Sequence, residues 1–150
     1  MLVSALLSTV HVLTLALGLG AVFLRGRALA RPLDDEGWRR LLAADNAWGL
    51  AAVSWIGSGM LRVLYGGKGP YFYFHNAFFW IKMGLFALVF LLELAPMTTF
   101  VHARLERRRG APPPVFPVGA YRAINMIELL LVMTIVFCAA LMARAVWMFE

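Results

Sequence analysis

The sequence has a single cysteine and few charged residues, and these two shortages exclude several classes of protein. With Cys138 alone, the chain cannot form an internal disulfide or a metal site built on paired cysteines. Charged residues make up 15% of the chain, whereas soluble domains carry about 25%. The sequence also lacks a P-loop, a dinucleotide-binding fingerprint, an HExxH pair and a nucleophile elbow. These absences argue against ATP-driven, NAD-linked or hydrolytic chemistry by known motifs, and they leave open whether the chain is an enzyme.

Long apolar runs fill most of the sequence instead. Hydrophobic residues make up 62% of the chain, and the mean hydropathy is +0.77. A membrane-spanning helix needs about 20 mostly apolar residues. Four stretches meet that requirement, at residues 2–24, 46–64, 77–100 and 119–149. The sequence therefore predicts an all-α integral membrane protein, a four-helix bundle with short loops that forms one transmembrane domain.

The basic residues predict how the spans are oriented. Arginines gather in the first and third loops, whereas the loop between the second and third spans contains only Lys68. Positively charged loops stay on the cytoplasmic side, so both termini are expected outside. Under this interpretation Arg25 and Arg104 mark topology beside the lipid headgroups. The net charge of +6 then reflects a membrane surface, and nucleic acid is not expected as a partner.

The segment between the first two spans predicts a short helix at the membrane interface. Asp34 or Asp35 can cap this helix after Pro32. Trp38 and Leu41 are then expected to face the membrane while the neighbouring arginines face water.

Polar and ionisable residues lie inside the apolar runs, and they are the candidate functional residues because a membrane disfavours a buried charge. The set comprises His11, Ser58, Arg62, Lys82, Glu93, Asn125 and Glu128. Helical periodicity places Lys82 and Glu93 on one face of the third span, and polar residues of the other spans likewise share a face. Polar faces that turn toward one another produce a bundle with a polar core.

The outer half of this core is predicted to be cationic. At a rise of about 1.5 Å per residue, His11 and Ser58 fall at a similar depth, and Arg62 and Lys82 lie further out. These four residues are the predicted pocket for haem or another anionic ligand. An intramembrane histidine is commonly a hydrogen-bonded packing residue, but it is also a common axial ligand of haem iron. If His11 binds iron, the second ligand is absent, a water or a methionine such as Met60.

The inner half of the core is predicted to be acidic. Glu93 and Glu128 lie there beside Asn125. One interpretation is a structural polar core in which Glu93 pairs with a neighbouring helix. The other is a proton path from His11 through Glu93 to Glu128.

Several segments resemble a bacterial family of predicted membrane proteins of unknown function. The matching segments are residues 11–20, 44–50, 55–59, 75–84 and 93–97, which include the sequences ADNAWGL, WIGSG and HNAFFWIKMG. The resemblance extends over nearly the whole chain and implies a small multi-pass protein of the bacterial inner membrane. It implies no particular activity.

The chain is also similar, more distantly, to haem-binding membrane protoporphyrinogen oxidases and to the copper-resistance membrane domain. The shared features are a histidine in the first helix, here His11, and a tryptophan followed by lysine, here Trp80 and Lys82. This resemblance implies haem b bound by His11, with Lys82 lining the same pocket. The chain departs from those proteins where Glu93 stands in place of their later histidine, so the implied oxidase chemistry lacks one of its ligands.

Three functions follow from these observations as alternatives. The favoured one is a non-catalytic accessory subunit that binds a cofactor or lipid within a membrane assembly. The second is a haem-dependent membrane oxidoreductase acting on a porphyrin or quinone. The third is a proton or solute carrier. The expected partners are the lipid bilayer and either other membrane subunits or further copies of the chain.

Overall fold

The chain folds into long helices, in agreement with the predicted all-α membrane bundle. The computed structural model describes residues 2–149. Its four long helices are α1 (Leu2–Leu29), α2 (Asp35–Tyr65), α4 (Ala77–Arg108) and α5 (Val118–Ala143). The short helix α3 (Gly69–Phe74) lies between α2 and α4. Each of the four long helices has the length and apolar composition needed to cross a membrane.

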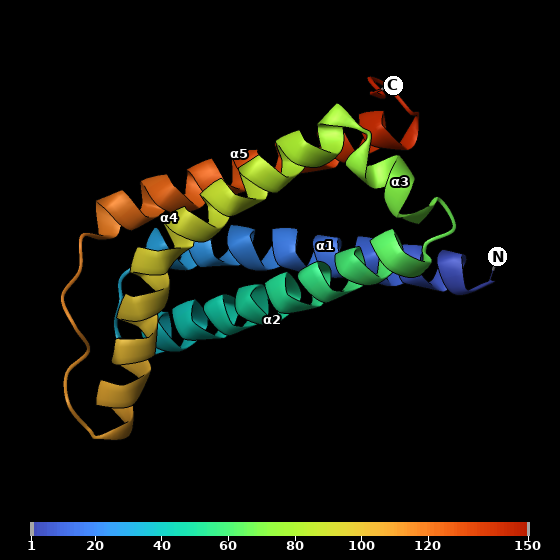
Figure 1. The fold of residues 1–150 in the computed structure, drawn as a ribbon. Helices are drawn as coiled ribbons and strands as arrows, with labels where there is room; N and C mark the ends of the chain where they lie inside the picture. Colours follow the sequence, from blue (N-terminus) through green and yellow to red (C-terminus); the bar gives the residue numbers. More distant parts are fainter. Residues whose placement is uncertain (1, 150) are drawn as a thin grey trace.

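The long helices form two antiparallel pairs, as short connections between neighbours require. In Figure 1, α1 lies along α2 and α4 lies along α5. The two pairs approach each other near the loop that joins α1 to α2, and they diverge toward the end that holds α3 and both chain termini. Both termini therefore lie at one end of the bundle, and which side of the membrane that end occupies stays a prediction.

The first turns of α2 correct the predicted interfacial helix. Asp34 does cap a helix, because its Oδ1 accepts a hydrogen bond from the Gly37 amide at 2.7 Å. That helix continues without a break into the second span, however. Trp38 and Leu41 are buried against Leu29 and Phe100, so they face the protein core and not lipid. The prediction that they face the membrane is wrong because α1 and α4 extend far enough to cover them.

A bend at Pro96 brings the last part of α4 over the ends of α1 and α2. Proline lacks an amide hydrogen and its ring clashes with the preceding turn, so it bends a helix. Figure 1 shows the bend, beyond which α4 crosses the end of the α1–α2 pair. Tyr121 of α5 braces the bend by donating a hydrogen bond to the Ala95 carbonyl at 3.1 Å. Phe100 and Ala103, beyond the bend, are completely buried.

The last helix ends earlier than the predicted span. That span reached residue 149, but α5 ends at Ala143 and the following residues fold back onto the start of α4. Asn76, the N-cap of α4, accepts from the Phe78 amide at 2.9 Å and donates to the Val146 carbonyl at 3.0 Å. The Ala77 amide donates to the Trp147 carbonyl at 3.1 Å. These contacts fix the C-terminal segment beside α3.

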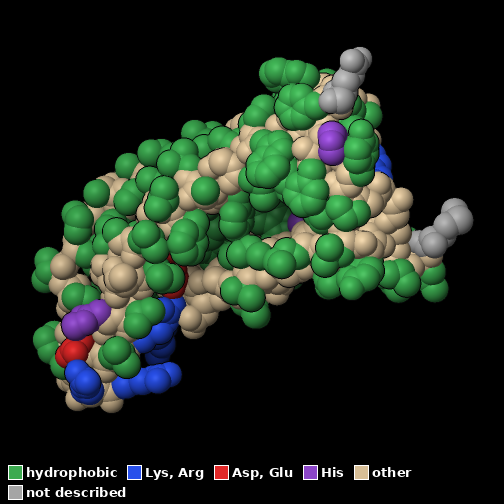
Figure 2. Space-filling model, viewed as in Figure 1, with side chains coloured by type: hydrophobic (Ala, Val, Ile, Leu, Met, Phe, Trp, Pro, Cys, Tyr) green, Lys and Arg blue, Asp and Glu red, His purple; other side chains and the backbone are tan. Residues whose placement is uncertain are grey.

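The interior contains two large apolar clusters at different levels of the bundle and a smaller one near α3, which comprises Tyr73, Phe79 and Met142. The central apolar layer comprises Ala21, Val22, Trp48, Trp55, Val89, Val132 and Ile135. The loop-end cluster comprises Ala28, Leu29, Trp38, Leu41, Phe100, Ala103 and Tyr121. The outer surface is also largely hydrophobic, with basic side chains, all arginines, gathered at the end where α4 terminates (Figure 2). Such a surface fits contact with lipid along the four long helices.

Candidate functional site

Arg25 is the centre of a buried ionic cluster that joins all four long helices. Its side chain is 1% exposed. One guanidinium nitrogen donates to Asp45 of α2 at 3.2 Å and to Glu93 of α4 at 2.6 Å. The other donates to the second Glu93 oxygen at 3.0 Å and also to Glu128 of α5. The bidentate pairing with Glu93 uses the planar fork that only arginine provides.

Two further residues complete what we call the Arg25 cluster, which consists of Arg25, Asp45, Glu93, Arg104, Asn125 and Glu128. Asn125 accepts a hydrogen bond from Arg25 Nε at 2.9 Å and donates to the Val22 carbonyl at 3.1 Å. Arg104 reaches back from the bent end of α4 and pairs with Asp45. Asp45 therefore lies between two guanidinium groups, and the bend at Pro96 is what positions the second one.

Apolar side chains enclose this cluster along the bundle axis. On α1, Val22 of the central apolar layer precedes Arg25, and Leu29 of the loop-end cluster follows it. On α5, Val132 lies on one side of Glu128 and Tyr121 on the other. The cluster is therefore held in a low-dielectric environment, where ionic hydrogen bonds are strong and unpaired charges are costly.

His11 lies in a second polar region, on the other side of the central apolar layer. Its Nε2 accepts a hydrogen bond from the Trp55 indole at 2.9 Å, and its Nδ1 lies 2.9 Å from Ser58 Oγ. The indole N–H can only donate, so Nε2 carries no hydrogen and the imidazole is neutral, with its hydrogen on Nδ1. Nδ1 then donates to Ser58, whose hydroxyl donates to the Trp55 carbonyl at 3.1 Å. Both ring nitrogens of His11 are thus in use.

The diverging helix pairs leave a cavity beside His11, which we call the Lys82 cavity. It has two adjoining parts, of about 190 and 250 Å³, and His11, Arg62, Tyr73 and Lys82 line both. One part lies mainly between α2 and α4, and the other mainly between α1 and α5. Together the two parts reach the lower range of small-molecule sites, about 300–1,000 Å³.

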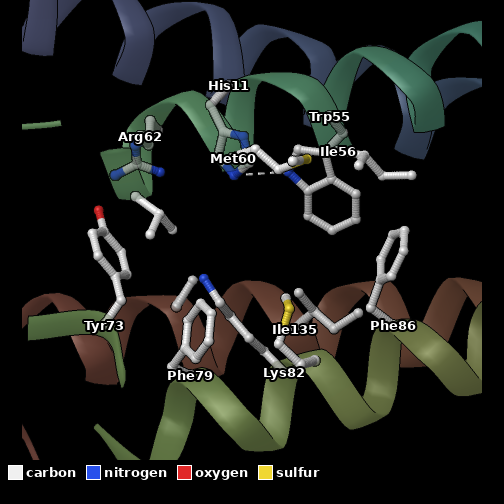
Figure 3. A pocket seen from close by; sticks show the side chains of 14 residues that line it. His11, Trp55, Ile56, Met60, Arg62, Tyr73, Phe79, Lys82, Phe86 and Ile135 are labelled. Carbon is white, nitrogen blue, oxygen red and sulfur yellow. Dashed lines mark hydrogen bonds between the residues drawn. The ribbon is translucent and has the colours of Figure 1, made fainter. Parts of the chain in front are cut away.

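The lining of the Lys82 cavity is largely apolar, and its cations are Arg62 and Lys82, which line both parts, and the exposed Lys68, which lines one. Figure 3 shows Lys82 extending from α4 across the cavity toward the side that holds His11 and Arg62. Aromatic and aliphatic side chains line most of the remainder, and the Lys82 ammonium lies 5.3 Å from the centre of the Phe79 ring. Within the described part of the chain, no aspartate or glutamate lines either part of the cavity. Among residues 2–149, no acidic group pairs with Arg62 or Lys82.

The arrangement around His11 does not fit an axial ligand of haem. Iron binds a histidine through a free nitrogen lone pair, and the Nε2 lone pair accepts the Trp55 hydrogen bond. Ligation would break that bond and leave the buried indole N–H without its acceptor. Met60, whose sulfur is the second ligand suggested from the sequence, does line the cavity. Haem binding stays a prediction, and an absorption spectrum of the natively purified protein tests it.

The structure brings the predicted residues together in two groups. His11, Ser58, Arg62 and Lys82 lie toward the end that holds α3, and Ser58 reaches the cavity only through its bond to His11. Glu93, Asn125 and Glu128 meet in the Arg25 cluster. The central apolar layer lies between the two groups, across the predicted proton path from His11 to Glu93. The proton path stays a prediction, and His11 and Glu93 are not in direct contact in the structure.

Sequence reasoning missed three members of the Arg25 cluster. The charge pattern predicts that Arg25 and Arg104 are loop residues beside lipid headgroups. Asp45 falls just outside the predicted second span, residues 46–64. The helices α1, α2 and α4 are longer than their apolar runs, so Arg25 and Asp45 are buried in the bundle and Arg104, 23% exposed, reaches into it. The inner half is therefore not simply acidic, as predicted, since two arginines accompany its carboxylates. One signal could have revealed them: Glu93 and Glu128 lie inside the predicted spans at a depth where the predicted core has no cation to pair with them.

Comparison with known proteins places nearly the whole chain in one group. The family described as "Predicted membrane protein (DUF2214)" matches residues 3–146. No curated protein and no solved structure matches the chain.

Proposed function

The chain belongs to this family of predicted membrane proteins, whose description names no activity, and we propose from the site itself that it binds an anionic amphiphile in the Lys82 cavity. The ligand class is a molecule with a phosphate or carboxylate head and an apolar body, such as an anionic lipid. In this role the chain is a non-catalytic, lipid-binding accessory subunit of a bacterial inner-membrane assembly.

The observation that carries the proposal is the pair of cations without a matching anion. Arg62 and Lys82 are half-buried and line both parts of the cavity, yet no carboxylate of residues 2–149 lines it with them. Charged residues inside membrane helices are ordinarily paired with one another or with a bound ligand. An anionic headgroup supplies the missing charge and accepts hydrogen bonds from both side chains.

The shape of the cavity supports an amphiphile over a small inorganic anion. Apolar and aromatic side chains make up most of the lining, including Trp55, Phe86 and Ile135. One part of the cavity lies mainly between α2 and α4, and the other lies mainly between α1 and α5. The outer faces of these four helices carry large exposed hydrophobic residues. An acyl or prenyl chain can therefore extend from the headgroup site between the helices toward the bilayer.

Native mass spectrometry of the full chain in mild detergent tests the proposal, with phosphatidylglycerol and phosphatidylcholine offered separately. We expect one tightly held phosphatidylglycerol per chain and a loss of about tenfold or more in affinity in Arg62→Gln/Lys82→Gln, because two charge-assisted contacts are removed. Arg144→Gln is the matched control, since Arg144 is exposed and lies outside the cavity lining. Equal binding of both lipids, or unchanged binding by the double variant, contradicts the proposal.

A further inference from the structure

The charges of the Arg25 cluster do not balance. Asp45, Glu93 and Glu128 supply three carboxylates, whereas Arg25 and Arg104 supply two guanidinium groups. With all five groups ionised, the cluster carries one net negative charge. The groups come from every long helix, and Asn125, the sixth member, is neutral. A buried carboxylate without a counter-charge ordinarily takes up a proton instead of staying ionised.

Glu128 is the carboxyl group with an open oxygen. Its side chain is completely buried, and its Oε2 faces Arg25. Its Oε1 is buried and has no hydrogen-bond partner among residues 2–149. Buried polar atoms are nearly always hydrogen-bonded, so an orphaned carboxylate oxygen needs an explanation. A proton on Glu128 provides one, because it removes the charge that the environment fails to satisfy.

Glu93 lies beside Glu128, and it is the carboxyl group through which a proton can reach the cluster. One oxygen of Glu93 and one of Glu128 accept hydrogen bonds from the same Arg25 nitrogen, so the two carboxyl groups lie side by side. Adjacent carboxyl groups favour a state in which one of them is protonated. The Glu93 side chain is 16% exposed, against 9% for Asp45 and 0% for Glu128. Of the three carboxyl groups, Glu93 is the one through which a proton can enter.

We propose that the Arg25 cluster is a binding site for one exchangeable proton, held by Glu128 beside Glu93. On binding, the Glu128 carboxylate gains an O–H bond, and the net charge of the cluster changes from minus one to zero. No other bond forms or breaks. This site is separate from the Lys82 cavity, because the central apolar layer lies between them. It therefore does not depend on the identity of the ligand proposed there.

Infrared spectroscopy of the full chain in detergent, at neutral pH, tests the proposal through the carbonyl stretch of protonated carboxyl groups. We expect a band equivalent to one buried carboxyl group per chain, with a shift in D₂O that reports exchange. Glu128→Gln should abolish this band. Asp45→Asn should abolish it too, because two carboxylates then balance two arginines. Arg104→Gln should enlarge it, because one arginine then faces three carboxyl groups.

Glu106→Gln is the matched control, because Glu106 pairs with Arg109 near the end of α4 and lies outside the cluster. This variant should leave the band unchanged. Absence of the band from the unmodified protein, or its persistence in folded Glu128→Gln, overturns the proposal. A band that appears only when choline replaces sodium also overturns it, since a bound sodium ion would then supply the missing charge. If Glu128→Gln fails to fold, Asp45→Asn and Arg104→Gln test the same charge balance.

Discussion

The Arg25 cluster and the Lys82 cavity both place charged side chains inside an apolar bundle, but they satisfy those charges differently. Around Arg25, carboxylates and guanidinium groups surround one another with little space between them. Around Lys82, cations line a cavity in which residues 2–149 place no acidic side chain. The comparison indicates that complementary charges close the first region, whereas charges of one sign leave the second region open to a ligand.

The geometry of the two helix pairs explains why the regions differ. Arg25 contacts α2, α4 and α5 where the pairs approach each other, so its bonds hold the four helices together there. The pairs diverge toward α3, and side chains such as Lys82 no longer reach an opposing helix with a partner on it. One end of the bundle therefore serves as the anchor, and the other is the end at which a ligand can bind.

The largest expected effect comes from removing the anchor. Arg25→Met keeps a long side chain but leaves three carboxyl groups without their shared donor, and loss of one partner of a buried ion pair costs about 3–5 kcal/mol. We expect a large decrease in Tm in detergent, measured by circular dichroism. Arg27→Met is the matched control, because Arg27 is exposed and lies two residues away on the same helix. Equal Tm values for the two variants would show that the cluster does not hold the bundle together.

An intermediate effect is expected when the cavity is given the anion that it lacks. Lys82→Glu places a carboxylate in the cavity opposite Arg62, as in the Arg25 cluster. We expect phosphatidylglycerol binding to decrease about tenfold or more, which corresponds to about 1.4 kcal/mol, without a decrease in Tm. Lys82→Gln separates the two causes, because it removes the cation without adding an anion. A Tm decrease as large as that of Arg25→Met would contradict the distinction between the two regions.

Periodicity and apolar length were sufficient to predict the general architecture. The four spanning helices follow from runs of about 20 apolar residues; the first three runs lie within long helices of the structure, and the fourth extends past the end of α5 at Ala143. The grouping of Glu93 with Glu128 also follows from depth and face alone. These features depend on local sequence, because a helix fixes the spacing of its own side chains.

The members of the Arg25 cluster that were missed depend on tertiary structure. Arg25 and Arg104 lie beyond the apolar runs, where an arginine ordinarily marks a cytoplasmic loop. Arg25 becomes buried because α1 continues to Leu29 and α4 bends at Pro96 to cover that end of the bundle. Hydropathy does not report such a bend, nor which helix packs over which. The open space beside Lys82 was likewise beyond sequence reasoning, because it results from the divergence of two helix pairs.

The smallest expected effect on Tm comes from breaking an exposed ion pair, and it tests whether an ion pair must be buried to stabilise the bundle. Arg39 pairs with Glu36 on the first turns of α2, but their side chains are 70% and 48% exposed. Water already solvates both charges, so breaking an exposed pair changes stability little. We expect Arg39→Gln to leave Tm within experimental error of the unmodified protein, in the same detergent and by the same measurement as Arg25→Met. A clear decrease would mean that exposed charges near the loop end also stabilise the bundle, and burial would then not explain the importance of Arg25.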